Sequence, residues 1–229
     1  MVDFALVPER TALLNIDLQE CFIRDSPIAA PEGPAVLERL NRLATVCRRA
    51  RITVIHTRLV TEPGGRDLGV FGQTSPPARS GLLDRDAPSA QLDAGLLVAD
   101  GDIILDKPRF GAFTRTALDD MLRAQGIDSV IIGGVATNVC CETTAREAMQ
   151  REFHVFFLSD GTAAADMPGA SAAELQKASL ATLGFLFGQV LTVDETIAKI
   201  EAATPRMERN SSRDISPAPP AKARWIRSG

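Results

Sequence analysis

The chain alternates between two patterns of apolar positions, and each pattern predicts a different element. Short runs that are apolar at nearly every position, and rich in β-branched residues, are typical of strands buried on both faces of a sheet. Segments with apolar residues three and four positions apart are typical of helices that bury one side. The expected strands are residues 11–16, 52–57, 102–105, 129–132, 154–159 and 189–192. The expected helices are residues 34–49, 89–96, 114–125, 171–185 and 194–203, with a further helix starting at residue 139.

This alternation of strands and helices predicts a parallel sheet with helices on both faces, that is, a three-layer α/β/α sandwich. One domain is expected over residues 1–204. Residues 59–88 are rich in Gly, Pro, Arg and Asp without a clear period. They predict a long surface loop, and loops of that length are usually functional or mobile. Residues 205–229 contain prolines, serines and basic side chains without an apolar period, which predicts a disordered tail. The alternative is that this tail docks on the acidic remainder of the chain or on a neighbouring subunit.

The composition of the 229-residue chain fits a globular protein and narrows its partners. Hydrophobic residues make up 45% of it, yet no run is long enough to span a membrane, and the first ten residues do not resemble a signal peptide. The net charge of −4 gives no electrostatic case for binding nucleic acid. The four cysteines, Cys21, Cys47, Cys140 and Cys141, do not form the pattern of a disulfide framework. They favour a reducing compartment such as the cytoplasm.

Residues 129–152 combine a strand, a tight turn and a helix that starts with cysteines. Gly133 and Gly134 permit a turn where side chains would clash, and Thr137 and Asn138 are both suitable N-cap residues. The N-terminus of a helix carries partial positive charge. A cysteine in the first turn is therefore expected to have a lowered pKa and to be a better nucleophile.

Helical spacing separates the two adjacent cysteines. The apolar positions 141, 145, 148 and 149 follow the spacing of a stripe that faces the core, so Cys141 is expected to pack. Cys140 lies off that stripe, in line with Thr144 and Glu147, and is expected to face a site. The alternative is that both cysteines are buried fillers, since free cysteine is often buried.

Three reactive side chains fall at the ends of expected strands. Asp17 follows the first strand, Lys107 follows the third, and Cys140 follows the fourth. Because sites in parallel sheets lie at the carboxyl ends of the strands, this placement predicts a Cys-Asp-Lys site. Taken singly, each residue has a structural interpretation: Asp17 as a loop carboxylate, Lys107 as a solvated charge, and Cys140 as a filler.

Three motifs resemble those of the isochorismatase-like cysteine hydrolases. They are NIDLQECF at residues 15–22, DKPRFGAF at 106–113 and GGVATNVC at 133–140, and the resemblance extends from about residue 8 to about residue 203. It implies a Rossmann-like, six-stranded parallel sheet with strand order 3-2-1-4-5-6. It also implies a catalytic triad of Asp17, Lys107 and Cys140.

The same resemblance implies the backbone geometry around Cys140. Family members have a non-proline cis peptide just before the helix, here between Val135 and Ala136. It would turn the N–H of Ala136 toward the substrate, beside the N–H of Cys140, to form an oxyanion hole. Members commonly form dimers or tetramers, so a homo-oligomer is expected.

Within the family, residues 136–148 (ATNVCCETTAREA) and 107–110 (KPRF) are most similar to ureidoacrylate amidohydrolases and related amidases. Nicotinamidases of this family bind a metal through an Asp-x-His motif and another histidine. The region compared here, residues 54–56 (VIH), has no aspartate, so neither a metal nor an organic cofactor is expected.

These observations predict a cysteine-dependent amidohydrolase that cleaves an amide or ureido C–N bond of a small molecule through a thioester. Phe22, Phe110 and Phe113 are expected to wall the pocket, and Asn138 to orient the leaving group. The arginines at positions 58, 66, 79 and 85 are candidates for binding a carboxylate, although loop arginines are more often solvated. Two alternatives stay open: an isochorismatase-type hydrolase acting on another bond, and a non-catalytic binding or redox-sensing protein that uses Cys140.

Overall fold

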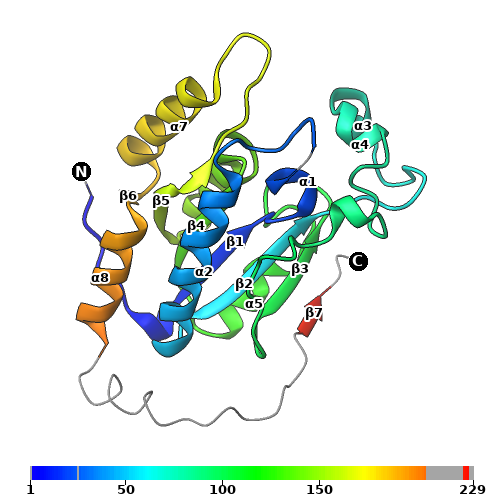
Figure 1. Ribbon diagram of the computed structural model, residues 1–229. Coiled ribbons are helices and arrows are strands. Elements are labelled where there is room, and N and C mark those ends of the chain that lie inside the picture. The colour runs from blue at the N-terminus through cyan, green and yellow to red at the C-terminus, as the bar shows by residue number, and fades with distance from the viewer. Residues whose placement is uncertain (1, 25, 205–223, 227–229) are drawn as a thin grey trace.

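A seven-stranded parallel sheet forms the centre of the computed structural model, which describes residues 2–24, 26–204 and 224–226. Its strand order is β6-β5-β4-β1-β2-β3-β7 (Figure 1). The strands are β1 (Thr11–Ile16), β2 (Thr53–Leu59), β3 (Ile103–Lys107), β4 (Ser129–Val135), β5 (His154–Ala163), β6 (Gln189–Leu191) and β7 (Arg224–Ile226). The first six strands have the expected order 3-2-1-4-5-6, and β7 adds a seventh strand beside β3.

Helices cover both faces of the sheet. They are α1 (Glu20–Ile23), α2 (Gly33–Arg49), α3 (Val70–Thr74), α4 (Pro76–Arg79), α5 (Leu118–Ala124), α6 (Glu142–Met149), α7 (Ala172–Leu186) and α8 (Val193–Ala203). Short 3-10 turns at Pro8–Arg10 and Pro88–Ala90, and a π-helix at Thr137–Cys141, complete the regular structure. No helix among the described residues is long and apolar enough to cross a bilayer.

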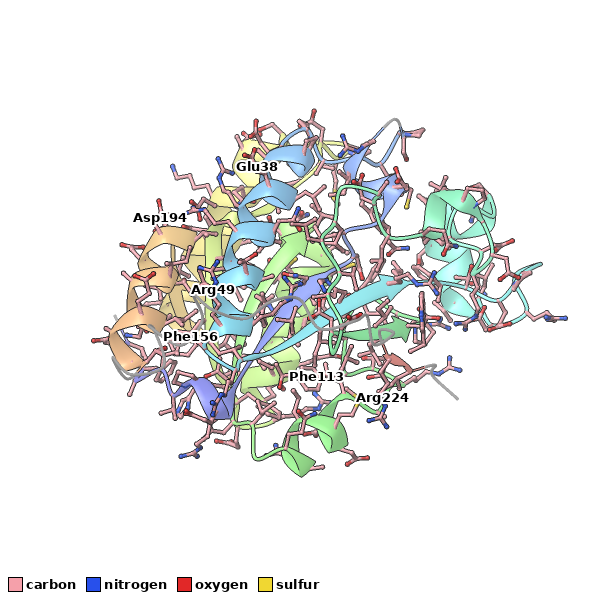
Figure 2. The ribbon with its side chains drawn as sticks, turned by 60° about the horizontal axis from the view of Figure 1, so that its bottom comes forward. Glu38, Arg49, Phe113, Phe156, Asp194 and Arg224 are labelled. Atoms are coloured by element: carbon pink, nitrogen blue, oxygen red, sulfur yellow. The ribbon has the colours of Figure 1, made fainter. Side chains whose placement is uncertain are left out.

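Two hydrophobic cores separate the sheet from its helices, so the three-layer prediction is confirmed. Alternate side chains of each strand point to opposite faces. In β1, Leu13 belongs to the core beneath α2 and α8, and Leu14 to the core beneath α5, α6 and α7. Figure 2 shows α2 and α8 side by side on one face, with Glu38 and Arg49 marking α2 and Asp194 marking α8.

The expected elements are confirmed in the sheet but need correction at several helix ends. Residues 89–96 form only the 3-10 turn at Pro88–Ala90, and the helix expected from residue 114 begins at Leu118. β4 does not end before the glycines but continues to Val135. Gly134 is required there because a Cβ would lie 2.0 Å from the carbonyl oxygen of Ile16. Gly134 therefore lets β4 approach β1 closely, and the two glycines do not make a turn.

The long segment after β2 is not entirely irregular. It contains α3 and α4, which lie beyond the carboxyl ends of β2 and β3 (Figure 1). Ser75 caps α4 by accepting a hydrogen bond from the N–H of Ala78. This segment is thereby placed next to the edge of the sheet where the candidate residues converge.

The prediction of a disordered tail is wrong for Arg224–Ile226, which form β7. Ile104 pairs with Trp225 in a parallel register, and the Trp225 ring lies 4.5 Å from the guanidinium carbon of Arg58. The side chain of Ile226 packs against the core on the α5 face. The remaining tail positions, 205–223 and 227–229, lie outside the described residues.

Deleting residues 205–229 should lower the free energy of unfolding by about 1–3 kcal/mol, because strand pairing, apolar contact and the cation–π contact are lost together. Urea denaturation measures the change. Trp225→Ala, which removes only the ring, should account for about 1 kcal/mol of it. Unchanged unfolding midpoints in both variants would show that β7 does not dock on β3 in solution.

Candidate active site

The carboxyl ends of β1, β3 and β4 bring Asp17, Lys107 and Cys140 together. Asp17 directly follows β1 with a φ of 52°, Lys107 is the last residue of β3, and Cys140 lies in the π-helix that follows β4. Asp17 and Lys107 are fully buried, and Cys140 is 3% exposed. The expected convergence at the carboxyl edge of the sheet is therefore present in the structure.

Asp17 and Lys107 form a buried ion pair. Lys107 Nζ lies 2.7 Å from Asp17 Oδ2, and it donates to the carbonyl oxygens of Arg109 and Phe110 at 3.1 and 2.8 Å. Although burial lowers the pKa of Lys107, the negative charge of Asp17 raises it overall. The lysine is therefore charged, and its three ammonium protons face three protein oxygens.

Thr57 fixes the carboxylate from the strand between the two partners. Its hydroxyl donates to Asp17 Oδ1 at 2.6 Å and accepts from the Asp17 N–H at 3.1 Å. Asp17 Oδ2 has no hydrogen-bond partner among the described residues besides its ion pair with Lys107. Because a carboxylate oxygen has two lone pairs, Oδ2 keeps one that can accept a proton.

The pKa of the Cys140 thiol is raised, contrary to the expectation from its position near a helix start. Burial is the largest cause, the charge of Lys107 opposes it, and the charge of Asp17 adds to it. Desolvation thus outweighs the helix N-terminus and the lysine. The resting thiol is neutral and has to lose its proton before it can act as a nucleophile.

The backbone around Cys140 has the expected cis peptide between Val135 and Ala136. The N–H of Ala136 makes no hydrogen bond to the described residues. The expected side-chain cap is absent: Ala136 precedes the π-helix, and the Thr137 hydroxyl donates to Gln176 instead. At this helix start, the N–H groups of Val139 and Cys141 donate to the Ala136 carbonyl at 3.1 and 3.2 Å.

The helix that follows Cys140 also holds the loop that follows Lys107. Thr144 donates to the Cys140 carbonyl at 2.7 Å and accepts from the Ala112 N–H at 3.1 Å. Glu147 accepts from the Phe113 N–H at 3.1 Å and from the Thr114 hydroxyl. These anchors were not predicted, although their spacing from Cys140 places them on one side of the helix.

Gln19 is a second positioning residue that sequence reasoning missed. Its buried amide accepts from the Leu59 N–H at 2.7 Å and donates to the carbonyl oxygens of Leu59 and Ala90 at 3.1 and 2.8 Å. It therefore fastens the chain after β1 to the end of β2. Its only sequence signal is a polar position two residues after Asp17.

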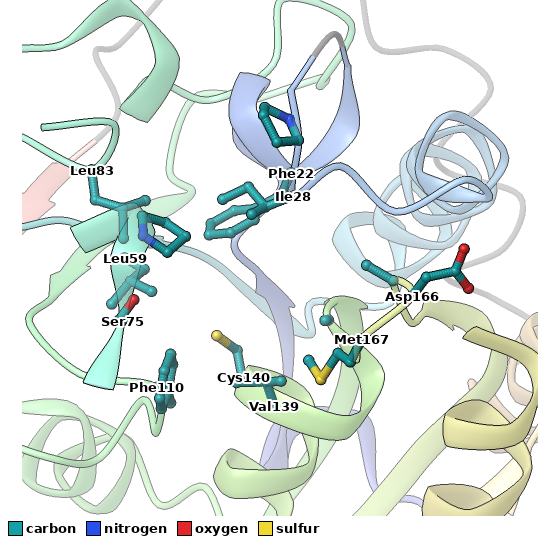
Figure 3. A pocket seen from close by; sticks show the side chains of 14 residues that line it. Phe22, Ile28, Leu59, Ser75, Leu83, Phe110, Val139, Cys140, Asp166 and Met167 are labelled. Carbon is teal, nitrogen blue, oxygen red and sulfur yellow. The ribbon is translucent and has the colours of Figure 1, made fainter. Parts of the chain in front are cut away.

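A cavity of about 240 Å³ opens over Cys140. Figure 3 shows the sulfur pointing into the space between Phe22 and Phe110, with Met167 nearby. The other lining residues are Pro27, Ile28, Leu59, Ser75, Pro77, Leu83, Ala136, Val139, Ala165 and Asp166. Phe22 and Phe110 thus lie in the wall as expected, and Ala136, which was expected to contribute to an oxyanion hole, also lines the cavity.

Phe113 and Asn138 do not line this cavity. The Phe113 ring packs 5.7 Å from that of Phe153 in the core on the α5 face, because the Glu147 carboxylate holds its N–H on that side. The Asn138 side chain donates to the sulfur of Met167 at 3.5 Å, and its buried oxygen has no partner among the described residues. Cys141, fully buried in the same core as Phe113, packs as predicted.

His56 is a buried strand residue, as expected. Its Nε2 lies 2.9 Å from Asp102 Oδ2, and its Nδ1 lies 3.3 Å from the Asn15 amide nitrogen. In the described part of the chain, no three His, Cys, Asp or Glu side chains are grouped so that they could hold a metal ion. The site therefore offers a thiol, a carboxylate and an ammonium group.

Comparison with known proteins identifies the family. The Isochorismatase domain matches residues 11–195, so the chain belongs to the isochorismatase family. Ureidoacrylate amidohydrolase RutB of Methylorubrum extorquens is 30% identical over 215 residues, which cover 85% of this chain and 83% of that protein. Nicotinamidase 3 of Arabidopsis thaliana is 35% identical over 186 residues, which cover 80% of this chain and 85% of that protein.

The fold is shared with solved members. A cysteine hydrolase from Pseudomonas syringae pv. phaseolicola 1448A superimposes with a TM-score of 0.85 at 35% identity, covering 88% of this chain and 97% of that one. The resemblance recognised from the three motifs is thereby confirmed at the level of family and fold.

Lys107→Met should lower the free energy of unfolding by about 3–5 kcal/mol, because it leaves the Asp17 carboxylate buried without a counter-charge. Denaturant titration measures the loss. Asp17→Asn in the same background removes the stranded charge, so the double variant should be more stable than Lys107→Met alone. If the double variant loses as much stability as Lys107→Met alone, or as much as the two single variants together, the two charges are not coupled.

Proposed function

We propose that the protein is a cysteine-dependent amidohydrolase that cleaves an amide or ureido C–N bond of a small molecule. The observation that carries this proposal is the thiol of Cys140 at the floor of a cavity, next to a carboxylate paired with a buried ammonium group. The two amidohydrolase relatives support the same reaction class.

The proposed reaction begins with proton transfer from the Cys140 thiol to Asp17. The thiolate then attacks the carbonyl carbon of the substrate, and the N–H groups of Ala136 and Cys140 stabilise the oxyanion. Asp17 returns its proton to the nitrogen as the C–N bond breaks, and the amine leaves. Lys107 keeps Asp17 in position, and its positive charge stabilises the negative charge at the site during both proton transfers.

Hydrolysis of the thioester completes the cycle. Asp17, again a carboxylate, accepts a proton from water, and the hydroxide attacks the acyl carbon. The sulfur leaves as the thiolate and recovers its proton from Asp17. Besides the substrate and one water molecule, the proposed steps use only Cys140, Asp17, Lys107 and the backbone N–H groups of Ala136 and Cys140.

The two alternatives have less support. A redox sensor requires an accessible thiol of low pKa, whereas Cys140 is 3% exposed and its pKa is raised. An isochorismatase-type reaction at another bond would leave the nucleophilic thiol without a role. The four free cysteines also suit the reducing cytoplasm that we propose as the location.

Cys140→Ala should abolish ammonia release from every amide that the wild-type protein hydrolyses. Cys141→Ala is the matched control: it should keep most turnover and lower the stability by about 1 kcal/mol, because it leaves a small cavity in the core. A coupled ammonia assay on both folded variants measures this. Equal losses in the two variants would contradict the assignment of the nucleophile.

A further inference from the structure

We propose that the substrate is a small carboxamide whose acyl group is neutral and apolar, either aromatic or branched aliphatic. This inference rests on the proposed amidohydrolase function and specifies which amides the site accepts. A substrate that carries a carboxylate on its acyl group would be rejected.

None of the described residues that line the cavity carries a positively charged side chain. Eleven of its fourteen lining residues have hydrocarbon side chains or the methionine thioether, and the other three are Ser75, Cys140 and Asp166. Ser75 uses its hydroxyl oxygen as the cap of α4. Asp166, the one charged lining residue, is itself acidic, and Figure 3 shows its carboxylate pointing away from the cavity.

The arginines expected to hold a carboxylate are engaged elsewhere. Arg58 forms a bidentate pair with Asp106 at 2.8 and 3.0 Å, and Arg85 bridges Asp106 and Glu62. Arg79 donates to carbonyl oxygens within its own segment, and the exposed Arg66 lies 4.0 Å from Glu62. None of the four lines the cavity.

Lys107 cannot serve as the anion partner either. Its ammonium group faces Asp17 and the carbonyl oxygens of Arg109 and Phe110, which account for its three protons. A substrate carboxylate entering the cavity would lose its hydration without gaining a counter-charge, which is strongly unfavourable. The negative charge of Asp17 would oppose it further.

The shape of the wall selects the acyl group. Phe22 and Phe110 stand on either side of the Cys140 sulfur (Figure 3), so a flat or branched apolar group can lie between them while its carbonyl carbon reaches the sulfur. The cavity of about 240 Å³ is smaller than the roughly 300–1,000 Å³ of pockets for drug-sized ligands. It therefore suits an acyl group of the size of benzoyl or isovaleryl.

Matched amides test this proposal. The kcat/KM for benzamide should exceed that for 4-carboxybenzamide by about 100-fold or more, and the kcat/KM for isovaleramide should exceed that for succinamate similarly. Ratios within threefold, or a preference for the acids, would overturn the proposal. A preference for the acids would leave the amidohydrolase function intact and refute only the proposal that the acyl group is neutral.

Binding to the Cys140→Ala variant separates the pocket from the reaction. Calorimetry with this variant should detect benzamide and give at least tenfold weaker binding for 4-carboxybenzamide. If the wild type hydrolyses none of the amides while this binding preference persists, the proposed function fails and the pocket assignment stands. Absence of binding by either compound would overturn the pocket assignment.

Met167→Arg places a cation at the mouth of the cavity, at a position that is 39% exposed and so tolerates a charge. It should lower the preference for benzamide over 4-carboxybenzamide at least tenfold, whereas the matched Met167→Leu control should leave the ratio within twofold. An unchanged ratio in a folded Met167→Arg protein would contradict the proposal that carboxylates are rejected because the cavity lacks positive charge.

Discussion

The buried ion pair between Asp17 and Lys107 is the constraint on which the rest of the site depends. Both side chains are fully buried, and taking two charges out of water is favourable only when geometry and hydrogen bonds compensate for the lost hydration. Three adjacent strands provide that geometry: β1 ends at the carboxylate, β3 ends at the ammonium group, and β2 between them supplies the Thr57 hydroxyl. The parallel sheet is therefore the frame that holds the charges in contact. The loop after Lys107 supplies the remaining acceptors, and the helix after Cys140 fastens that loop through Thr144.

Because Asp17 and Lys107 are both fully buried, their charges affect the pKa of the Cys140 thiol rather than interact with solvent or with a distant ligand. Lys107 lowers the pKa of Cys140, while Asp17 and burial raise it. In the proposed reaction, the same groups that keep the thiol neutral at rest give its proton a nearby destination. Burial of the three groups beneath an apolar wall lowers the local dielectric constant and so strengthens these electrostatic interactions. The ammonium group of Lys107 already faces Asp17 and two carbonyl oxygens, so under the proposed function it is not available to bind an ionic substrate.

The sheet and the three central residues could be predicted because their signals are local. Runs such as residues 129–132 are buried on both faces, which makes them apolar at every position, and reactive residues at the strand ends follow from parallel topology. Other features depend on contacts that no local pattern encodes. The three residues of β7 are too few for a periodic signal and become a strand by pairing with β3. Phe113 lies three residues beyond Phe110, yet the anchor at Glu147 turns it into the core. The pKa of Cys140 depends on its depth below the surface, so the helix position alone gave the wrong direction.

The control of Cys140 by its two charged neighbours is tested most directly by the pH dependence of its alkylation by iodoacetamide, in a protein whose other three cysteines are replaced. Lys107→Met should move the alkylation profile to higher pH, because it removes the charge that lowers the pKa of the thiol. Asp17→Asn should move the profile to lower pH and yet abolish amide hydrolysis, because the thiolate becomes easier to form while the proton carrier is lost. Opposite shifts of the two variants, with turnover lost in the more reactive one, would agree with the proposed roles. Superimposable profiles, or shifts in the same direction, would contradict them.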